Sequence, residues 1–524
     1  MRPLLVAGLM AGVLGVGLHW GTFAVGGSDS YCYAHQAERW ASGILQAPEP
    51  LALTAPWPSA PLTFAPAGHV PSPTVPGAIV PVCPPGLSIA MAPLFVLGGV
   101  WAIFLVVPIF GALLVAATYV LGSRFGPRVG VASAAVVACS PVFLFQLVQP
   151  MSDVPAAALW VLATAWATGT KRRAPLWAGV AASAAILMRP NLLPLGVVIG
   201  LFLAFRPERT WRARAYAATT YAAACAPGCV AVALVQFSLY GSPLRSGYST
   251  LDGLFAVSHI WPNLQRYPLW LWQTHTPVWL LAAAAPFLLP GWLSRLLAAL
   301  AIATVAGYLP YTVFEDWWYL RFLLPAIPLL LILTMAVVDA GIGRALALRH
   351  AATDPDLDGR SVARRRARRL AAQSGLAVVA VVLSAFFVRE ARARSVFDLA
   401  RLEARYARAG VFVARRLPAN ALVVTSWESG SVRFYSGRRT LVWDALDPAW
   451  LDRALAFARQ RGLEPFLLFE RWEEPAFRAR FAGSALAALD WPPMAEVASQ
   501  VRVYRPEDRE RYARGESVVT EYAR

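Results

Sequence analysis

Two isolated carboxylates, Asp29 and Asp153, lie in a stretch of chain that is otherwise poor in acidic residues. Asp29 belongs to GGSDSYCYAHQAERWASG (26–43), which directly follows an apolar run, and Asp153 belongs to QPMSDVPAAAL (149–159), between two further apolar runs. A carboxylate in such a place could accept a proton from a reacting hydroxyl group or bind a cation. Either residue could instead begin a helix, since Asp and the neighbouring Ser are good N-caps. Their occurrence in the first two loops on one side favours a functional role.

Three arginines are candidates for binding a phosphate group. Arg189 follows Ile-Leu-Met, Arg321 lies in FEDWWYLRFLL, and Arg245 lies in the loop that follows a long apolar run. The planar guanidinium group suits phosphate oxygens. For Arg189 and Arg321, snorkelling of the side chain to a membrane surface is an equal alternative.

Two long connections, 21–85 and 238–275, are expected to carry substrate contacts, because long loops are usually functional. The candidate contact residues there are Tyr33, His69, His259 and Arg266. The first connection also holds Cys32 and Cys83, which could form a disulfide or could be two small residues in a tight loop.

The composition determines the class of protein that carries these residues. Of 524 residues, 57% are hydrophobic and 15% are charged, and the mean hydropathy is +0.51. These values exclude a single water-soluble core and a disordered chain, and they predict a polytopic α-helical membrane protein. The apolar runs are continuous rather than alternating, which argues against an outer-membrane barrel. The net charge of +17 is concentrated in short loops between runs, where basic residues set topology, so we expect no nucleic-acid partner.

We predict about eleven transmembrane helices in residues 1–388. The 87–121 run breaks at Gly98-Gly99 and is interpreted as a surface helix leading into one span. With the N-terminus in the cytoplasm, nineteen basic residues fall inside and five outside, a strong positive-inside bias. A basic cytoplasmic linker is expected at 339–373. The predicted spans are 3–20, one within 87–121, 129–148, 154–170, 174–188, 191–205, 215–237, 276–292, 296–313, 322–338 and 375–388.

The last part of the chain, 389–524, differs in kind and predicts a small extracytoplasmic α/β domain. Four short strands are expected there, and two amphipathic helices alternate with them. This alternation indicates a mostly parallel sheet. The segment has no glycine-rich phosphate loop, so nucleotide binding is not supported. The expected strands are 421–427, 439–445, 465–470 and 499–506, and the expected helices are 451–462 and 473–483.

In their order and placement, several of these segments resemble the GT-C superfamily of polyprenyl-phosphate-dependent glycosyltransferases, near the protein-mannosyltransferase and aminoarabinose-transferase branch. They are the two segments around Asp29 and Asp153, PPGLSIAMAPLFVLGG (84–99), LMRPNLLPL (187–195) and WWYLRFLLPAIPLLL (317–331). The resemblance covers most of residues 1–340. It implies that Asp29 matches the catalytic carboxylate of the first outside loop and Asp153 the second acidic position. Several members carry an acidic pair where this chain has Asp29-Ser30, which makes a tightly held metal less certain.

We therefore expect an integral membrane enzyme of a bacterial inner membrane. It would move a sugar from a polyprenyl-phosphate donor to a lipid, glycan or protein hydroxyl group on the outer face, with Asp29 as general base and inversion at the anomeric carbon. Mg²⁺ or Mn²⁺ could bind to Asp29, Asp153 and substrate phosphate. The alternatives are a transporter or flippase of lipid-linked glycans, a non-catalytic scaffold and an oligosaccharide ligase. Few charges lie in the middle of the spans, which disfavours a transporter.

Overall fold

The computed structural model describes residues 2–206, 210–248, 251–353 and 362–523, and its backbone divides into two compact units. The helical unit comprises Met1–Gly21, Leu105–Val232 and Thr250–Phe397, and the α/β unit comprises Thr22–Phe104, Ala233–Ser249 and Asp398–Arg524. The grouping differs from a single division near residue 388, because the 21–85 connection belongs with the C-terminal sheet. Residues 354–361 of the expected linker lie outside the described residues.

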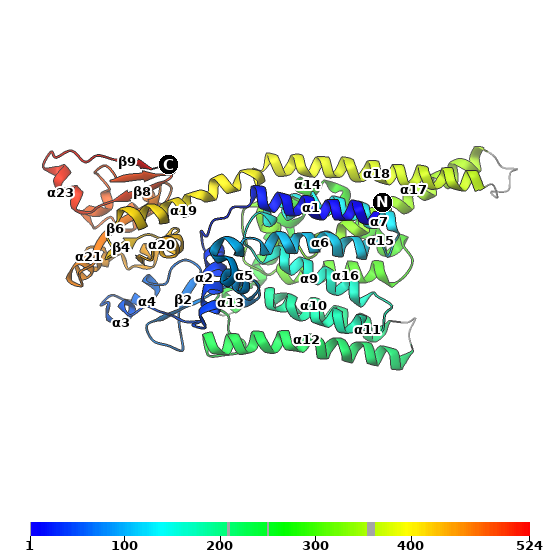
Figure 1. Cartoon of the computed structure of the whole chain (residues 1–524), viewed down its shortest axis with the longest axis horizontal. Helices are drawn as coiled ribbons and strands as arrows, with labels where there is room; N and C mark the ends of the chain where they lie inside the picture. The colour runs from blue at the N-terminus through cyan, green and yellow to red at the C-terminus, as the bar shows by residue number, and fades with distance from the viewer. Residues whose placement is uncertain (1, 207–209, 249–250, 354–361, 524) are drawn as a thin grey trace. The chain divides into compact units, whose positions relative to one another are not determined.

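Long apolar helices make up the helical unit (Figure 1). Their sequences are apolar around most of the helix circumference, as expected for helices that face lipid as well as one another. The helices are α1 (Arg2–Trp20), α6 (Val106–Gly122), α7 (Pro127–Ala138), α8 (Pro141–Leu147), α9 (Asp153–Ala167), α10 (Ala174–Met188), α11 (Leu193–Phe205), α12 (Trp211–Tyr240), α13 (Leu251–Leu254), α14 (Ile260–His275), α15 (Leu281–Leu288), α16 (Trp292–Tyr308), α17 (Ile327–Thr353) and α18 (Val362–Ala393). The last part of α12, from Ala233, belongs to the α/β unit. Short 3₁₀ turns join the helices, among them η1 (Pro190–Leu192), η2 (Val257–His259), η3 (Pro277–Leu280) and η4 (Trp317–Leu323).

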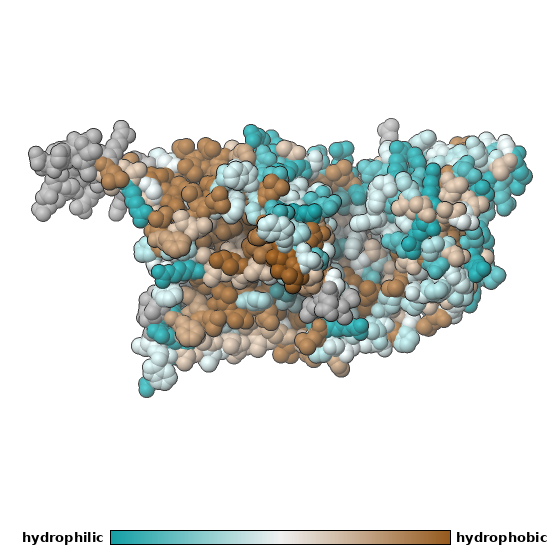
Figure 2. Space-filling model, turned by 180° about the vertical axis from the view of Figure 1, so that it is seen from behind, coloured by the Kyte–Doolittle hydropathy of each residue, from teal (hydrophilic) through white to brown (hydrophobic). Residues whose placement is uncertain are grey.

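Among the described residues, five helices are each long and apolar enough to cross a membrane, or six if the bent pair α7 and α8 forms one span. Six shorter apolar helices accompany them, and each predicted run contains an apolar helix. Hydrophobic side chains cover much of the surface of the helical unit (Figure 2). A multi-pass helical membrane protein is therefore confirmed, while the count of eleven spans stays a prediction.

The break expected at Gly98-Gly99 lies inside α5 (Pro85–Ile103). Gly99 has φ 65° and ψ −159°, a backbone conformation that glycine adopts without strain. The α5 helix belongs to the α/β unit, where it packs against α2 (Asp29–Ser42), and α6 then begins in the helical unit. The single apolar run at 87–121 therefore contains two helices with different environments.

A six-stranded sheet with strand order β5-β4-β6-β8-β7-β9 forms the centre of the α/β unit. The β4 strand pairs in parallel with β5 and β6, whereas β8 is antiparallel to both β6 and β7. The β9 strand pairs in parallel with β7, so most pairings of this sheet are parallel, as expected. The β8 strand runs against its neighbours because a hairpin joins β7 to β8. The strands are β4 (Ala421–Val424), β5 (Arg439–Leu441), β6 (Glu464–Glu470), β7 (Ala495–Val497), β8 (Val501–Tyr504) and β9 (Glu521–Ala523).

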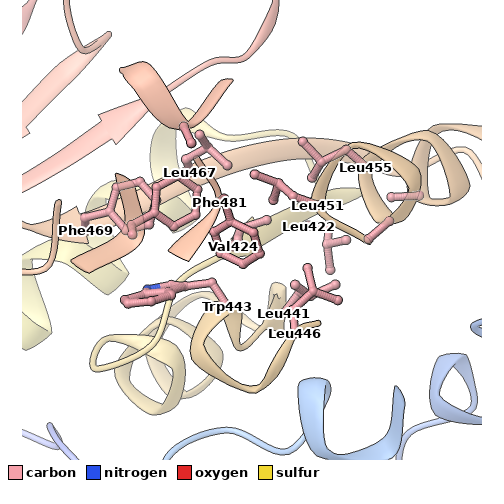
Figure 3. Close-up of a cluster of buried hydrophobic side chains, with 14 of the residues drawn as sticks. Leu422, Val424, Leu441, Trp443, Leu446, Leu451, Leu455, Leu467, Phe469 and Phe481 are labelled. Carbon is pink, nitrogen blue, oxygen red and sulfur yellow. The ribbon is translucent and has the colours of Figure 1, made fainter. Parts of the chain in front are cut away.

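Helices cover both faces of this sheet, because successive strand residues alternate between two apolar clusters. Leu422 and Val424 face one cluster with α21 (Leu451–Gln460) and α22 (Glu474–Arg480), as Figure 3 shows for part of it. Val423 faces the other cluster, with α19 (Leu399–Arg416) and α20 (Ser429–Ser436). A further helix, α23 (Glu507–Ala513), follows β8.

The 21–85 connection is an ordered part of the α/β unit rather than an open loop. Besides α2, it forms α3 (Leu51–Thr54), α4 (Ala60–Thr63) and a small sheet of β1 (Ala47–Pro48), β3 (Ala78–Pro81) and β2 (His69–Pro71). Trp57 and Phe64 belong to the apolar cluster that Leu422 and Val424 face. The buried Glu49 pairs with Arg433 of α20 at 2.7 Å. The 238–275 connection also differs from expectation, since α14 forms most of its second half.

Candidate functional site

Asp153 forms a buried ion pair with Arg189 in the helical unit. Asp153 is the first residue of α9, is 1% exposed, and its Oδ1 lies 2.8 Å from Nη2 of Arg189. Ser152 occupies the N-cap position without a side-chain capping bond. The helix start was therefore expected correctly, but the Asp153 carboxylate contacts a guanidinium group. Removing one partner of a buried pair leaves a charge uncompensated, so each residue holds the other in place.

Besides Asp153, the polar groups of Ser152 and Tyr308 contact the Arg189 guanidinium. Its Nε donates to Ser152 Oγ at 3.2 Å, and its Nη1 donates to the Tyr308 hydroxyl at 3.0 Å. The amide of Asn191 donates to the same hydroxyl at 2.8 Å. Arg189 has an extended backbone between α10 and η1, as expected for a residue before proline. The Met-Arg-Pro-Asn turn thus ends α10 and places Arg189 and Asn191 on one tyrosine.

Arg321 lies close to the same aromatic ring as Arg189. The guanidinium carbons of Arg189 and Arg321 lie 5.5 Å and 5.2 Å from the centroid of the Phe322 ring, and Arg321 also lies 5.5 Å from the Tyr319 ring. Cation–π contacts of this kind hold a guanidinium in position. The structure therefore brings together two of the three predicted phosphate-binding arginines, from η4 and from the end of α10.

Asp29 belongs to the α/β unit, where it begins α2 and is half-buried. Ser28 is at the N-cap without a side-chain capping bond, so the position resembles that of Asp153. One turn further on, Cys32 forms a disulfide with Cys83, with Cα atoms 6.1 Å apart. Tyr33 is buried, and its carbonyl accepts a hydrogen bond from Ser88 Oγ at 3.0 Å. The start of α2 is therefore fixed to the segment that leads into α5.

His69 contacts His35 of α2, with His35 Nδ1 and His69 Nε2 2.8 Å apart. Burial, with the nearby Arg39, lowers the pKa of His35 to about 3, and burial and His35 lower the pKa of His69 well below its usual value. Both rings are therefore neutral at physiological pH. Tyr31 packs on both rings, and its own ring lies against Gly430, where any side chain would collide with it. His69 thus has a packing role in this structure.

The third predicted phosphate-binding arginine, Arg245, and the predicted contact residues His259 and Arg266 lie in different places. Arg245 is exposed on the segment after α12, in the α/β unit, so it belongs to a different unit from Arg189 and Arg321. His259 Nδ1 lies 3.2 Å from the Pro310 carbonyl oxygen. Arg266 donates to the Phe314 carbonyl and lies 3.5 Å from Glu315. His259 and Arg266 therefore connect the η2–α14 segment to the chain that follows α16.

The environment of Asp153 does not fit a divalent cation, because a guanidinium group already contacts its Oδ1. Among the described residues, no group of three or more His, Cys, Asp and Glu side chains could hold a metal ion. Asp29 and Asp153 belong to different units, so their joint coordination of Mg²⁺ or Mn²⁺ stays a prediction.

Sequence reasoning missed Ser152, Tyr308 and the role of Asn191. Each is a polar residue at the end of an apolar run, which is the signal that could have found it. Tyr308 was not singled out because tyrosine at a membrane boundary is common without any specific role.

Known proteins share sequence features and the fold of this chain. Residues 84–234 match the family model for dolichyl-phosphate-mannose-protein mannosyltransferases. The crystal structure of ArnT from Cupriavidus metallidurans bound to undecaprenyl phosphate matches with a TM-score of 0.57 and 15% identity, covering 95% of this chain and 97% of that chain. The chain has the GT-C fold.

Two further structures agree with this assignment. ArnT in the apo state matches with a TM-score of 0.54 and 15% identity over the same shares of both chains. The Archaeoglobus fulgidus oligosaccharyltransferase in complex with Zn and sulfate matches with a TM-score of 0.50 and 12% identity, covering 93% of this chain and 71% of that chain. No curated protein sequence matches the chain. The resemblance to GT-C glycosyltransferases that the sequence indicated is confirmed, since the matching family and the proteins of these structures are glycosyltransferases of the GT-C type.

Proposed function

We propose that this protein is a membrane glycosyltransferase that moves a sugar from a polyprenyl-phosphate donor to an acceptor hydroxyl group on the extracytoplasmic face. The observation that carries the proposal is the pairing of the GT-C fold with two arginines around Phe322. ArnT of the same fold has been crystallised with undecaprenyl phosphate, which supports a lipid phosphate as part of the donor. The acceptor could be a lipid, a glycan or a protein.

The donor phosphate is assigned chiefly to Arg321. The Arg189 guanidinium already donates to Ser152 and Tyr308 and pairs with Asp153, so it acts best as a fixed positive group beside the phosphate. A charge that is fixed before reaction stabilises a leaving phosphate without reorganisation. Arg245 stays a predicted third contact.

Asp29 is proposed as the general base. The acceptor oxygen attacks the anomeric carbon as its proton passes to the Asp29 carboxylate, the bond from that carbon to the phosphate oxygen breaks, and polyprenyl phosphate leaves. A single displacement inverts the anomeric centre, whereas retention needs a second carboxylate near the first. The half-buried position of Asp29 at the start of α2 supports this role, since the side chain is accessible and the helix N-terminus favours negative charge.

The proposed sidedness has the N-terminus in the cytoplasm, eleven spans and 389–524 outside. Its support is that the first connection and the C-terminal sheet, both expected outside, form one compact unit, in which Glu49 pairs with Arg433. We expect fusions of alkaline phosphatase to be active after residue 524 and inactive after residues 170 and 370. Phosphatase activity at residue 370 would contradict the layout.

The transfer itself is best tested by mass spectrometry of envelope lipids and glycans from a strain that lacks the gene. Loss of one sugar from a glycan or lipid, with accumulation of its polyprenyl-phosphate donor, is the expected result. A full set of envelope glycans with no accumulated donor would exclude the proposed activity. Rescue by the intact gene, and not by one encoding Asp29→Asn, would connect the phenotype to the proposed base.

A further inference from the structure

The carboxyl ends of β4 and β6 lie where the order of the large sheet reverses. The chain leaves β4 through α20 to β5 on one side, and then crosses through α21 to β6 on the other side, with all three strands parallel. In open α/β sheets, ligands bind in the crevice at the carboxyl ends of the strands where the connections diverge in this way. The C-terminal sheet therefore has a place suited to a ligand.

The residues that follow these two strands are chemically unusual. Thr425, Trp427 and Glu428 follow β4, while Glu470 ends β6 and Trp472 and Glu473 come next. The three glutamates are 0%, 4% and 1% exposed, respectively. Glutamate is almost never fully buried unless it is paired.

Positive charge does not balance these three carboxyl groups. Arg405 Nε lies 3.1 Å from Glu470 Oε2, while Glu428 accepts from the Ser431 hydroxyl group. Glu473 accepts from the backbone N–H of Glu470 at 2.9 Å. Burial raises the pKa of Glu428 to about 8 and that of Glu473 to about 7, so near neutral pH these groups can donate as well as accept hydrogen bonds.

Several buried oxygens of this cluster have no hydrogen-bond partner within the described part of the chain. They are Oε1 of Glu428, Oε1 of Glu470 and Oγ1 of Thr425. Glu428 interacts electrostatically with Glu470, Arg405 and Glu473, so its side chain faces this group. Buried polar atoms are normally satisfied, and those that are not call for an explanation such as a ligand.

Two exposed tryptophans lie beside the cluster. The rings of Trp427 and Trp472 have centroids 5.5 Å apart, and the residues are 46% and 57% exposed. Trp472 Nε1 donates to Glu470 Oε2 at 2.9 Å, which fixes one indole to the buried carboxylate. Large exposed apolar groups next to convergent polar atoms are typical of a binding site.

We propose that the carboxyl ends of β4 and β6 form a binding site for a neutral glycan. A sugar ring presents an apolar face of C–H groups, which suits Trp427 and Trp472, and an edge of hydroxyl groups, which suits Glu428 and its neighbours. An anionic ligand is disfavoured because Arg405 is already paired with Glu470. The site belongs to the α/β unit alone and does not depend on the transfer reaction proposed above.

The test is saturation-transfer NMR on the full-length protein in detergent, with neutral mannose, glucose, galactose and arabinose oligosaccharides as probes. We expect saturable binding of at least one probe, weakened tenfold or more by Trp427→Ala and by Trp472→Ala. Tyr512→Ala is the matched control, because Tyr512 is also 46% exposed in the same unit. Glu428→Gln keeps the shape of the side chain and should weaken binding without loss of folding.

Two outcomes would overturn the proposal. One is that none of these oligosaccharides binds, or that binding is unchanged in all three site variants while each still elutes as folded protein. The other is that brominated lipids in nanodiscs quench tryptophan fluorescence, and that Trp427→Ala and Trp472→Ala abolish this extra quenching relative to Tyr512→Ala. The pair would then be a membrane anchor. If one tryptophan variant fails to fold, Trp472→Phe and Glu428→Gln provide the same comparison.

Discussion

The two helices that begin with an aspartate, α9 in the helical unit and α2 in the α/β unit, place that aspartate in different surroundings. Both have serine at the N-cap, and in neither does that serine form a side-chain capping bond. Asp153 is buried against Arg189, whereas Asp29 is half-buried. The same local sequence pattern therefore occurs in two surroundings. The Asp153 carboxylate is held by a guanidinium group, while the base role of Asp29 is our proposal and rests on its partly exposed position.

The largest expected effect is that of Asp29→Asn. Asparagine caps helices about as well as aspartate, so the fold should be kept, and only the basicity is removed. Loss of a general base lowers turnover by about 10²–10⁴-fold. The measurement is transfer from lipid-linked donor by purified protein, with unchanged gel filtration as the folding control. Near-normal turnover in the variant would exclude Asp29 as the base.

Arg189→Ala is expected to act mainly on stability. It leaves the buried Asp153 carboxylate without its partner, which costs about 3–5 kcal/mol. Arg401→Ala is the control, because Arg401 and its partner Asp398 are 76% and 52% exposed and such a pair contributes about 0–1 kcal/mol. Thermal unfolding in the same detergent compares the two. Equal unfolding temperatures would show that the Asp153–Arg189 ion pair does not stabilise the fold.

The comparison also shows what sequence could predict. Helix starts at Asp29 and Asp153 were one of the two interpretations that the sequence offered, and both helices begin there, although neither N-cap serine forms a side-chain capping bond. The partner of Asp153 was not expected, because Arg189 is 36 residues away and the proximity arises from the packing of α9 against α10. Tyr308 and Phe322 join the cluster from still more distant segments.

The sheet illustrates the same limit. Alternating and apolar runs predicted β4, β5, β6 and β8, whereas β7 and β9 lie outside such runs and were not expected. The order of the strands, which brings Glu428 next to Glu470, depends on connections that local sequence does not encode. The disulfide between Cys32 and Cys83 was left open for the same reason, since it requires α2 and the β3–α5 segment to meet.

Arg321→Ala is expected to have a smaller effect, on donor use. A charge-assisted hydrogen bond to phosphate contributes about 1.5–3 kcal/mol, so the apparent affinity for the donor should fall about tenfold or more. Affinity for the acceptor should change much less. The comparison variant is Arg389→Ala, whose side chain is 71% exposed. A donor affinity that matches wild type would assign Arg321 to the aromatic cluster alone.

The last expected effect concerns Glu428, a buried carboxyl group of the α/β unit that accepts a hydrogen bond from Ser431. Its pKa is raised from 4.5 to about 8 by burial, so between these pH values the folded state binds more protons than the unfolded state. Stability must then fall as pH rises from about 4.5 to about 8.

Glu428→Gln removes this proton uptake and should raise the apparent Tm at pH 8 relative to wild type, by about 2–4 °C for each kcal/mol recovered. At pH 4.5, where the wild-type carboxyl group is protonated, the two proteins should unfold at similar temperatures. Glu510→Gln, at an exposed position of α23, is the control and should leave the pH dependence unchanged. A parallel pH profile for Glu428→Gln and wild type would mean that Glu428 has a counter-charge in solution, and the contrast with Asp153 would then disappear.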